Sequence, residues 1–160
     1  MDKKVDLVLL SIHTPIKVGI YKDKKLQKSF LSSKKTGDGL IELFSEIFSY
    51  LEGFDLQIES IFYARGPGSF TALKLTHIFL HTLVLSKGVK LYSTDSFYFN
   101  QNMPIKAFGN KFFVCTEHRD NIELKDIGME EIEDCFILPE EICPEAFDTQ
   151  NTPLYILPPV

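Results

Sequence analysis

The chain has 160 residues, of which 44% are hydrophobic, which is enough to bury the core of one ordinary domain or of one full lobe with a reduced second lobe. Its formal net charge of −5 and pI near 5.4 argue against a protein that binds nucleic acid by itself, because such proteins carry a basic surface. Cys115, Cys135 and Cys143 show no CxxC spacing, so they predict neither a disulfide framework nor a zinc knuckle and fit a reducing compartment.

Three short apolar runs open the chain, at residues 5–12, 16–21 and 26–31. The first run is too short to cross a membrane, contains Asp6 and lacks a signal-peptide cleavage site. We therefore expect a cytoplasmic protein without a membrane segment. The turns between the runs, at His13-Thr-Pro15 and at Lys22-Asp-Lys-Lys25, predict three strands joined by hairpins.

Charge is distributed unevenly along the chain. The first 37 residues hold nine Lys against three Asp, whereas the remainder holds eight Lys or Arg against nineteen acidic residues. The simplest interpretation is that these lysines decorate solvent-facing strands and loops, and the alternative is a contact with tRNA or with an acidic surface of a partner. The lysines concerned are Lys22, Lys24, Lys25, Lys28, Lys34 and Lys35.

Residues 39–51 carry an amphipathic helical stripe, with Asp38 as the candidate N-cap and Gly53 as the stop signal. The stripe consists of Leu40, Phe44, Ile47, Phe48 and Leu51. A short buried strand is then expected at residues 60–64, a second helix at 70–86 that ends at Gly88, and a further strand at 90–93.

A Gly66-Pro67-Gly68 turn joins the predicted strand at 60–64 to the second helix. Proline fixes φ, while the two glycines permit positive φ and close approach of another group to the backbone. Ser69 is placed to cap the helix. Amides at Gly68, Ser69 and Phe70 then form a weak candidate for an anion site at the positive end of the helix dipole.

After residue 110 the strand pattern restarts, at 112–117, 121–127, 134–138 and finally 154–157. No long amphipathic helix follows, since Pro139 and Pro144 bracket a short acidic piece. We predict a first lobe over residues 1–105 and a reduced, mostly β second lobe over 106–160. Periodicity alone defines only a mixed α/β protein.

The second helix is apolar around most of its circumference, with Lys74, His77 and His81 on a narrow polar stripe. Such a helix must be covered on more than one side. The cover is either internal, from the first helix and the C-terminal residues, or another chain. The two histidines have the spacing of a metal pair, but no third ligand is identifiable, so we predict no metal.

The string Gly66-Pro-Gly-Ser-Phe-Thr71, preceded by Arg65, resembles the GRGPGSFTGLRIG signature of the TsaB (YeaZ) family. Ala72, Lys74 and Leu75 depart from it. Weaker similarity lies at three further places. Residues 9–14 resemble the LAIDTST segment of the family, residues 95–97 its VSSL segment, and residues 153–156 its C-terminal PLYLR segment. The resemblance implies an actin-like, ribonuclease-H-like first lobe with a mixed sheet and two main helices, and a truncated second lobe.

The resemblance implies a non-catalytic subunit in the N6-threonylcarbamoylation of adenosine 37 of tRNA, without a cofactor. In this family the TsaD subunit carries the metal and transfers the threonylcarbamoyl group, and TsaE supplies ATPase activity. The expected partners are a TsaD-like transferase subunit, a TsaE-like ATPase or a second copy of the chain, with tRNA contacted only within the complex. Carried onto this sequence, the partner interface comprises Leu40, Phe44, Ile47, Phe48, Leu51, Leu73, His77, Leu80, His81 and Val84.

Catalytic residues are not identifiable in the sequence. Ser69 lies outside a GxSxG elbow, and Cys115 near His118 fits a core thiol beside a turn. His13 stands where actin-like ATPases have an Asp that helps to hold Mg²⁺, and imidazole is a poor ligand for that ion. The alternative function is a small actin-like nucleotide-binding enzyme, an ATPase or a diverged peptidase-like protein.

Overall fold

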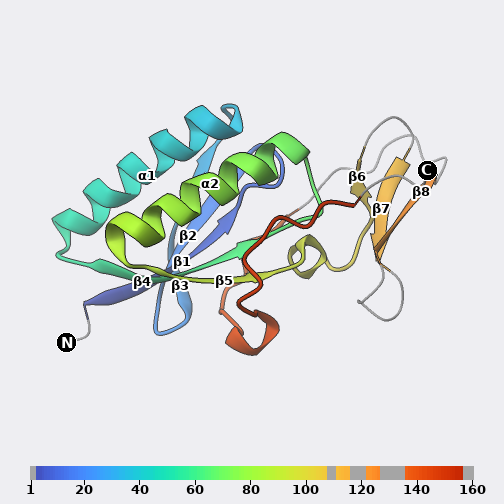
Figure 1. The fold of residues 1–160 in the computed structure, drawn as a ribbon. Coiled ribbons are helices and arrows are strands. Elements are labelled where there is room, and N and C mark those ends of the chain that lie inside the picture. Colours follow the sequence, from blue (N-terminus) through green and yellow to red (C-terminus); the bar gives the residue numbers. More distant parts are fainter. Residues whose placement is uncertain (1–2, 108–110, 116–121, 127–135, 157–160) are drawn as a thin grey trace.

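The computed structural model describes residues 3–107, 111–115, 122–126 and 136–156. Its main sheet is mixed and has five strands in the order β3-β2-β1-β4-β5, with β1 antiparallel to β2 and parallel to β4. A second, antiparallel sheet has the order β6-β7-β8. The predicted mixed α/β fold with two main helices and a small second β unit is confirmed (Figure 1).

The elements of the main sheet and its helices are β1 (Lys4–Leu10), β2 (Ile16–Lys22), β3 (Lys25–Ser32), α1 (Thr36–Gly53), β4 (Gln57–Ala64), α2 (Phe70–Lys87) and β5 (Lys90–Thr94). The elements that follow are η1 (Ser96–Phe99), β6 (Ile105–Lys106), β7 (Lys111–Cys115), β8 (Ile122–Asp126) and η2 (Pro144–Ala146). Both α-helices lie on one face of the main sheet (Figure 1).

Strand β1 is apolar along almost its whole length because both faces of the sheet are covered. Alternate residues of the strand belong to two separate cores. Leu7 and Leu9 pack under the helices, whereas Val8 and Leu10 pack on the opposite face, against Phe97 and other residues. The central strand therefore carries the apolar contacts of both layers.

The second face is covered by residues 136–156, here called the C-terminal strap. The strap bonds first to the β2–β3 hairpin, where the Leu26 amide donates to the Glu140 carbonyl at 2.9 Å. It then reaches the other edge of the sheet, where Ser93 and Asp148 exchange two backbone hydrogen bonds of 2.9 Å. Figure 1 shows it passing across the sheet and on toward α2.

Two predicted strands, at 134–138 and 154–157, are wrong in their described parts, because residues 136–138 and 154–156 are irregular. The strap crosses the sheet rather than running beside one strand. Its backbone groups therefore make isolated hydrogen bonds instead of a continuous ladder. The Ile137 amide donates to the Phe99 carbonyl, and the Leu154 amide donates to the Arg65 carbonyl. Residues 134, 135 and 157 lie outside the described residues.

Other expected boundaries are confirmed or need small corrections. Helix α1 begins two residues before Asp38, so its N-cap is Lys35 and Asp38 lies in the first turn. Helix α2 ends as predicted, with Gly88 in the left-handed conformation at φ 69°. Residues 116, 117, 121 and 127 of the second-lobe strands lie outside the described residues. The division at residue 105 stays a prediction.

The Gly66-Pro67-Gly68 turn places the start of α2 against the end of β1. Only Gly66 has a positive φ, of 128°; the sequence-based expectation of positive φ does not hold for Gly68. Gly68 is required for its small size instead, since a Cβ there would lie 2.7 Å from the Cβ of Ile12. The Ser69 amide donates to the Ile12 carbonyl at 3.1 Å and fixes the same contact.

We expect Gly68→Val to lower the free energy of unfolding by about 2–3 kcal/mol, the usual effect of overpacking a close contact. A Cβ at Gly68 would also lie 2.9 Å from the Ile12 carbonyl oxygen, so the backbone must move. The control is Gly53→Ala, where nothing lies within 4 Å of the added Cβ. Urea denaturation measures both variants, and equal stability of the two would contradict this role of Gly68.

Candidate protein-binding face of helix α2

Helix α2 has a buried side and an apolar outer side. Its buried residues, including Leu73, Leu80 and Leu83, face the interior. On the outer side four large apolar side chains are exposed, to between 36% and 89%, namely Phe70, Leu75, Ile78 and Leu85. We call these four residues the outer α2 face. The sequence of α2 contains no acidic residue, and its only charged residues are Lys74 and Lys87.

The predicted partner-interface residues divide into two groups in the structure. Six of them are at most 3% exposed and belong to the interior, namely Leu40, Phe44, Ile47, Leu51, Leu73 and Leu80. Phe48, His77, His81 and Val84 are half-buried. Five of these side chains pack in the core beneath the helices and Leu73 packs in the second core, so none of the six can contact a partner without rearrangement. The interface itself stays a prediction, and the outer α2 face offers side chains that the sequence-based set omits.

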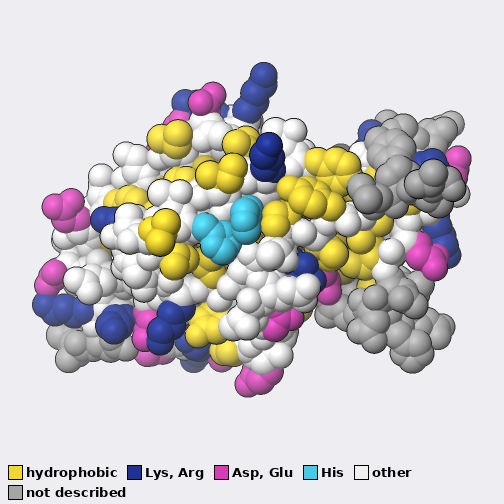
Figure 2. All heavy atoms as spheres, viewed as in Figure 1, with side chains coloured by type: hydrophobic (Ala, Val, Ile, Leu, Met, Phe, Trp, Pro, Cys, Tyr) yellow, Lys and Arg dark blue, Asp and Glu magenta, His cyan; other side chains and the backbone are white. Residues whose placement is uncertain are grey.

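The histidines on α2 meet the C-terminal strap rather than open solvent. The ring centres of His77 and His81 are 4.2 Å apart, and the Nε2 atom of His81 lies 3.0 Å from the carbonyl oxygen of Asn151. Figure 2 shows the histidine pair on the same face as hydrophobic side chains of the helix layer. The strap therefore covers this flank of α2, as internal cover requires, and leaves Leu75, Ile78 and Leu85 of the outer α2 face exposed.

The environment of His77 favours its neutral form. Desolvation is the largest effect and lowers the pKa of His77. The neighbouring His81 lowers this pKa further, and the hydrogen bond with the Asn151 backbone raises it. In the described ranges, no group of three His, Cys, Asp or Glu side chains is arranged to hold a metal ion. The expectation that no metal binds here stays a prediction.

At the candidate anion site of Gly68, Ser69 and Phe70, one of the backbone amides already donates a hydrogen bond within the chain. The Ser69 hydroxyl accepts from the Ala72 amide at 3.4 Å, which confirms the predicted cap. The Ser69 amide already donates to Ile12. The Phe70 ring meets the Tyr155 ring edge-on at 5.3 Å, so the start of the helix is partly covered by the strap. Anion binding stays a prediction.

The end of β1, where actin-like ATPases hold their nucleotide, is nearly filled. A hollow of about 30 Å³ remains between the His13-Thr14-Pro15 turn, Lys17 and Phe136. Phe136 belongs to the strap, its ring centre lies 6.0 Å from that of His13, and its carbonyl accepts from the Lys17 ammonium at 2.6 Å. This space suits one or two water molecules and is far too small for a nucleotide.

Most of the early lysines have partners within the chain. Lys24 pairs at 2.7 Å with Asp6, whose side chain is only 8% exposed, and Lys28 lies 5.0 Å from the centre of the Tyr50 ring. Lys3 pairs with Asp55 and Lys34 pairs with Glu42. Lys3, Lys24 and Lys34 therefore have a carboxylate partner within the chain, and a tRNA contact of this region stays a prediction.

Sequence reasoning left cover of α2 by the C-terminal residues open as one alternative, but it missed the path of the strap across the sheet. The hydrogen bonds of the strap are made mainly by backbone atoms, which leave no periodic pattern in the sequence. The local signals in the strap are its prolines, Pro139, Pro144 and Pro153, because proline cannot donate a hydrogen bond to a strand ladder. Within the described residues, no helix is long and apolar enough to cross a membrane.

Comparison with solved structures defines the fold as YeaZ-like. The chain is similar to YeaZ from Pseudomonas aeruginosa, with a TM-score of 0.54 and 13% sequence identity over 78% of this chain and 65% of that chain. A second structure is described as an uncharacterized protein from Pseudomonas aeruginosa with similarity to the peptidase YeaZ. It has the same score, identity and share of this chain, and 64% of its length is covered. This chain therefore spans slightly less than two thirds of either neighbour.

The sequence matches no protein-family model and no curated protein. At 13% identity, the similarity to these neighbours establishes the fold alone. The neighbours agree with the YeaZ-like fold that the Gly66–Thr71 string implied, and the roles that the resemblance implies for single residues remain expectations.

Lowering the pH should destabilise the fold at the histidine pair of α2. Because folding depresses the pKa of His77, its contribution to stability is complete above about pH 6.5, its ordinary pKa, and is lost as the pH falls through the lower folded value. We expect wild type to lose more thermal stability between about pH 7.5 and pH 5.5 than His77→Gln does. An equal loss in both proteins, measured by thermal unfolding in matched buffers, would show that His77 is not responsible.

Proposed function

We propose that this chain is a TsaB-like partner subunit that supports N6-threonylcarbamoylation of tRNA by docking on a TsaD-like transferase subunit. The observation that carries the proposal is a YeaZ-like fold whose second helix exposes an apolar outer face. The signature-like string Gly66–Thr71 lies at the start of that same helix. The sequence resemblance and the exposed surface therefore point to one element.

Physical arguments favour docking over chemistry. Burying exposed leucine, isoleucine and phenylalanine side chains is favourable by about 25 cal/mol per Å² of apolar area. Lys74, beside the outer α2 face, offers a charge that can set the register of a partner. The matching partner surface is apolar and carries a carboxylate opposite Lys74. The nearly filled hollow at His13 gives the alternative, an ATPase, no supporting geometry.

The reduced length limits which partners the proposal includes. The chain covers 65% of its YeaZ neighbour, and both α-helices lie within residues 36–87, in the predicted first lobe. We therefore assign the TsaD-like contact to the first lobe. A TsaE-like contact and self-association through the same helices remain secondary parts of the proposal, because a second copy would compete for the outer α2 face.

The direct experiment is co-purification with the cognate TsaD-like subunit, followed by a tRNA modification assay with and without this chain. We expect a stable complex and modification that depends on the chain. Titration with ATP and Mg²⁺ should give no binding heat in the absence of partners. Tight ATP binding with turnover by the isolated chain, or full modification without it, would overturn the proposal.

Within this proposal, Ile78→Glu should weaken binding of the TsaD-like subunit by about tenfold or more, because it places a charge in an apolar contact. Ile78 is 53% exposed, so the fold should tolerate the change. Leu31→Glu is the matched control, since Leu31 is 59% exposed but lies on strand β3, away from α2. Surface plasmon resonance compares them, and equal affinities for the two variants would exclude the outer α2 face as the interface.

A further inference from the structure

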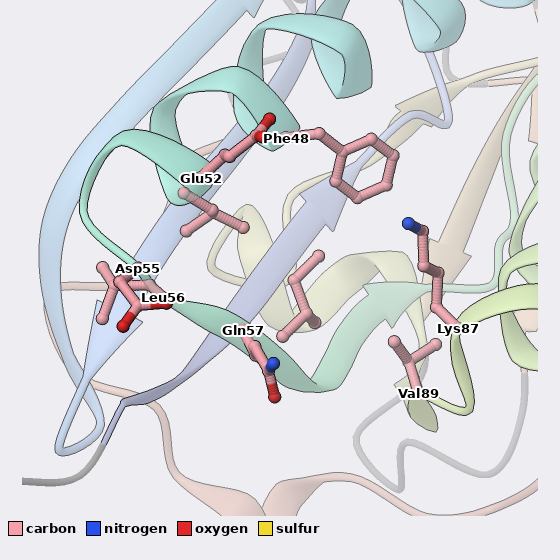
Figure 3. Close-up of a pocket in the computed structure, with 9 residues that line it drawn as sticks. Phe48, Glu52, Asp55, Leu56, Gln57, Lys87 and Val89 are labelled. Carbon is pink, nitrogen blue, oxygen red and sulfur yellow. The ribbon is translucent and has the colours of Figure 1, made fainter.

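An open hollow of about 600 Å³ lies where the ends of α1 and α2 meet the start of β4 (Figure 3). Its apolar lining comes from α1, from β4 and from the residues just before β4 and just after α2, namely Phe48, Leu51, Leu56, Ile58 and Val89. Leu51 and Val89 are at most 4% exposed and belong to the core beneath the helices. The volume is within the range typical of small-molecule sites.

Charged side chains stand at the rim of this hollow. Glu52, Asp55 and Lys87 are exposed, and Asp55 pairs with Lys3. A ligand that fits this arrangement places hydrocarbon on the apolar lining and a charged group at the mouth. A lysine side chain of a partner protein fits poorly, because it would enter with its ammonium group first.

The electrostatics at the mouth favour a positive group. Both α-helices end here, and helix C-termini carry partial negative charge. Helix α1 has no basic residue in its last turn to offset that charge, and Glu52 adds to it. The ammonium of Lys87 lies 5.1 Å from the centre of the Phe48 ring, so the site already holds one cation against an aromatic face.

We propose that this hollow binds a small organic cation, an aliphatic primary amine. Its hydrocarbon tail lies on Leu56, Ile58 and Val89, and its ammonium group replaces that of Lys87 over the Phe48 ring, near Glu52. The site lies at the far end of α2 from the Gly66–Gly68 turn (Figure 1). It goes beyond the proposed function, and its test needs no partner subunit.

The probe is n-hexylammonium, titrated into the full isotope-labelled chain and followed by amide chemical shifts in NMR spectra. We expect saturable shifts at Asp55, Leu56, Gly88 and Val89. n-Hexanol, with the same tail and no charge, should bind more weakly, and hexanoate should not saturate. Saturation by hexanoate at equal or lower concentration, or no saturable shift with the amine, would overturn the proposal.

Two variants test the assignment of charge. Lys87→Met removes the competing internal cation and should tighten n-hexylammonium binding by up to about fivefold, the range of an exposed charge interaction. Glu52→Gln should weaken it by a similar factor, whereas Glu46→Gln, on the exposed side of α1 outside the hollow, should leave it unchanged. Thermal midpoints check that each variant folds. Weaker binding of n-hexylammonium by Lys87→Met would show that Lys87 supports the ligand rather than competing with it, and would refute the proposal.

Discussion

The close contact between Gly68 and Ile12 is the constraint on which the rest of the arrangement depends. A Cβ at Gly68 would lie 2.7 Å from the Ile12 side chain, so only glycine lets the turn after β4 reach the end of β1. Three further backbone bonds meet at the same turn. The Ser69 amide donates to Ile12, the Ser96 amide donates to Gly66, and the Leu154 amide donates to Arg65.

The turn therefore joins the central strand, α2, the segment after β5 and the C-terminal strap at one place. Its geometry sets which side of α2 faces the interior and which side faces outward. Leu73 and Leu80 are buried as a result, while Leu75 and Ile78 remain exposed. The strap covers the flank with His77 and His81 and meets Phe70 at the start of the helix, but it leaves Leu75, Ile78 and Leu85 exposed. An apolar surface of defined orientation is the consequence.

Much of this organisation could be predicted from local sequence patterns. The helix stripe that includes Leu40 and Phe44 is a 3.6-residue repeat, and the Gly66-Pro67-Gly68 turn and the Ser69 cap are short-range signals. What could not be predicted depends on long-range packing. The path of the strap, the closure of the β1 end by Phe136 and the hollow beside Phe48 each join residues distant in sequence.

The predicted interface set shows the same limit. Periodicity identified the apolar stripe on α1, but it could not decide whether Ile47 and Leu51 face the sheet or a second chain, because both need apolar side chains. The structure places them in the core. On α2, where almost every face is apolar, periodicity carried less information still, and the exposure of Ile78 and Leu85 became visible only in three dimensions.

Hydrogen–deuterium exchange of the chain, with and without the proposed TsaD-like subunit, tests the central claim most directly. The account predicts slower exchange in peptides that cover α2 (Phe70–Lys87) and no change in peptides that cover β3 (Lys25–Ser32). Protection confined to β3, or a stable complex without protection of α2, would contradict a role for the outer α2 face in docking.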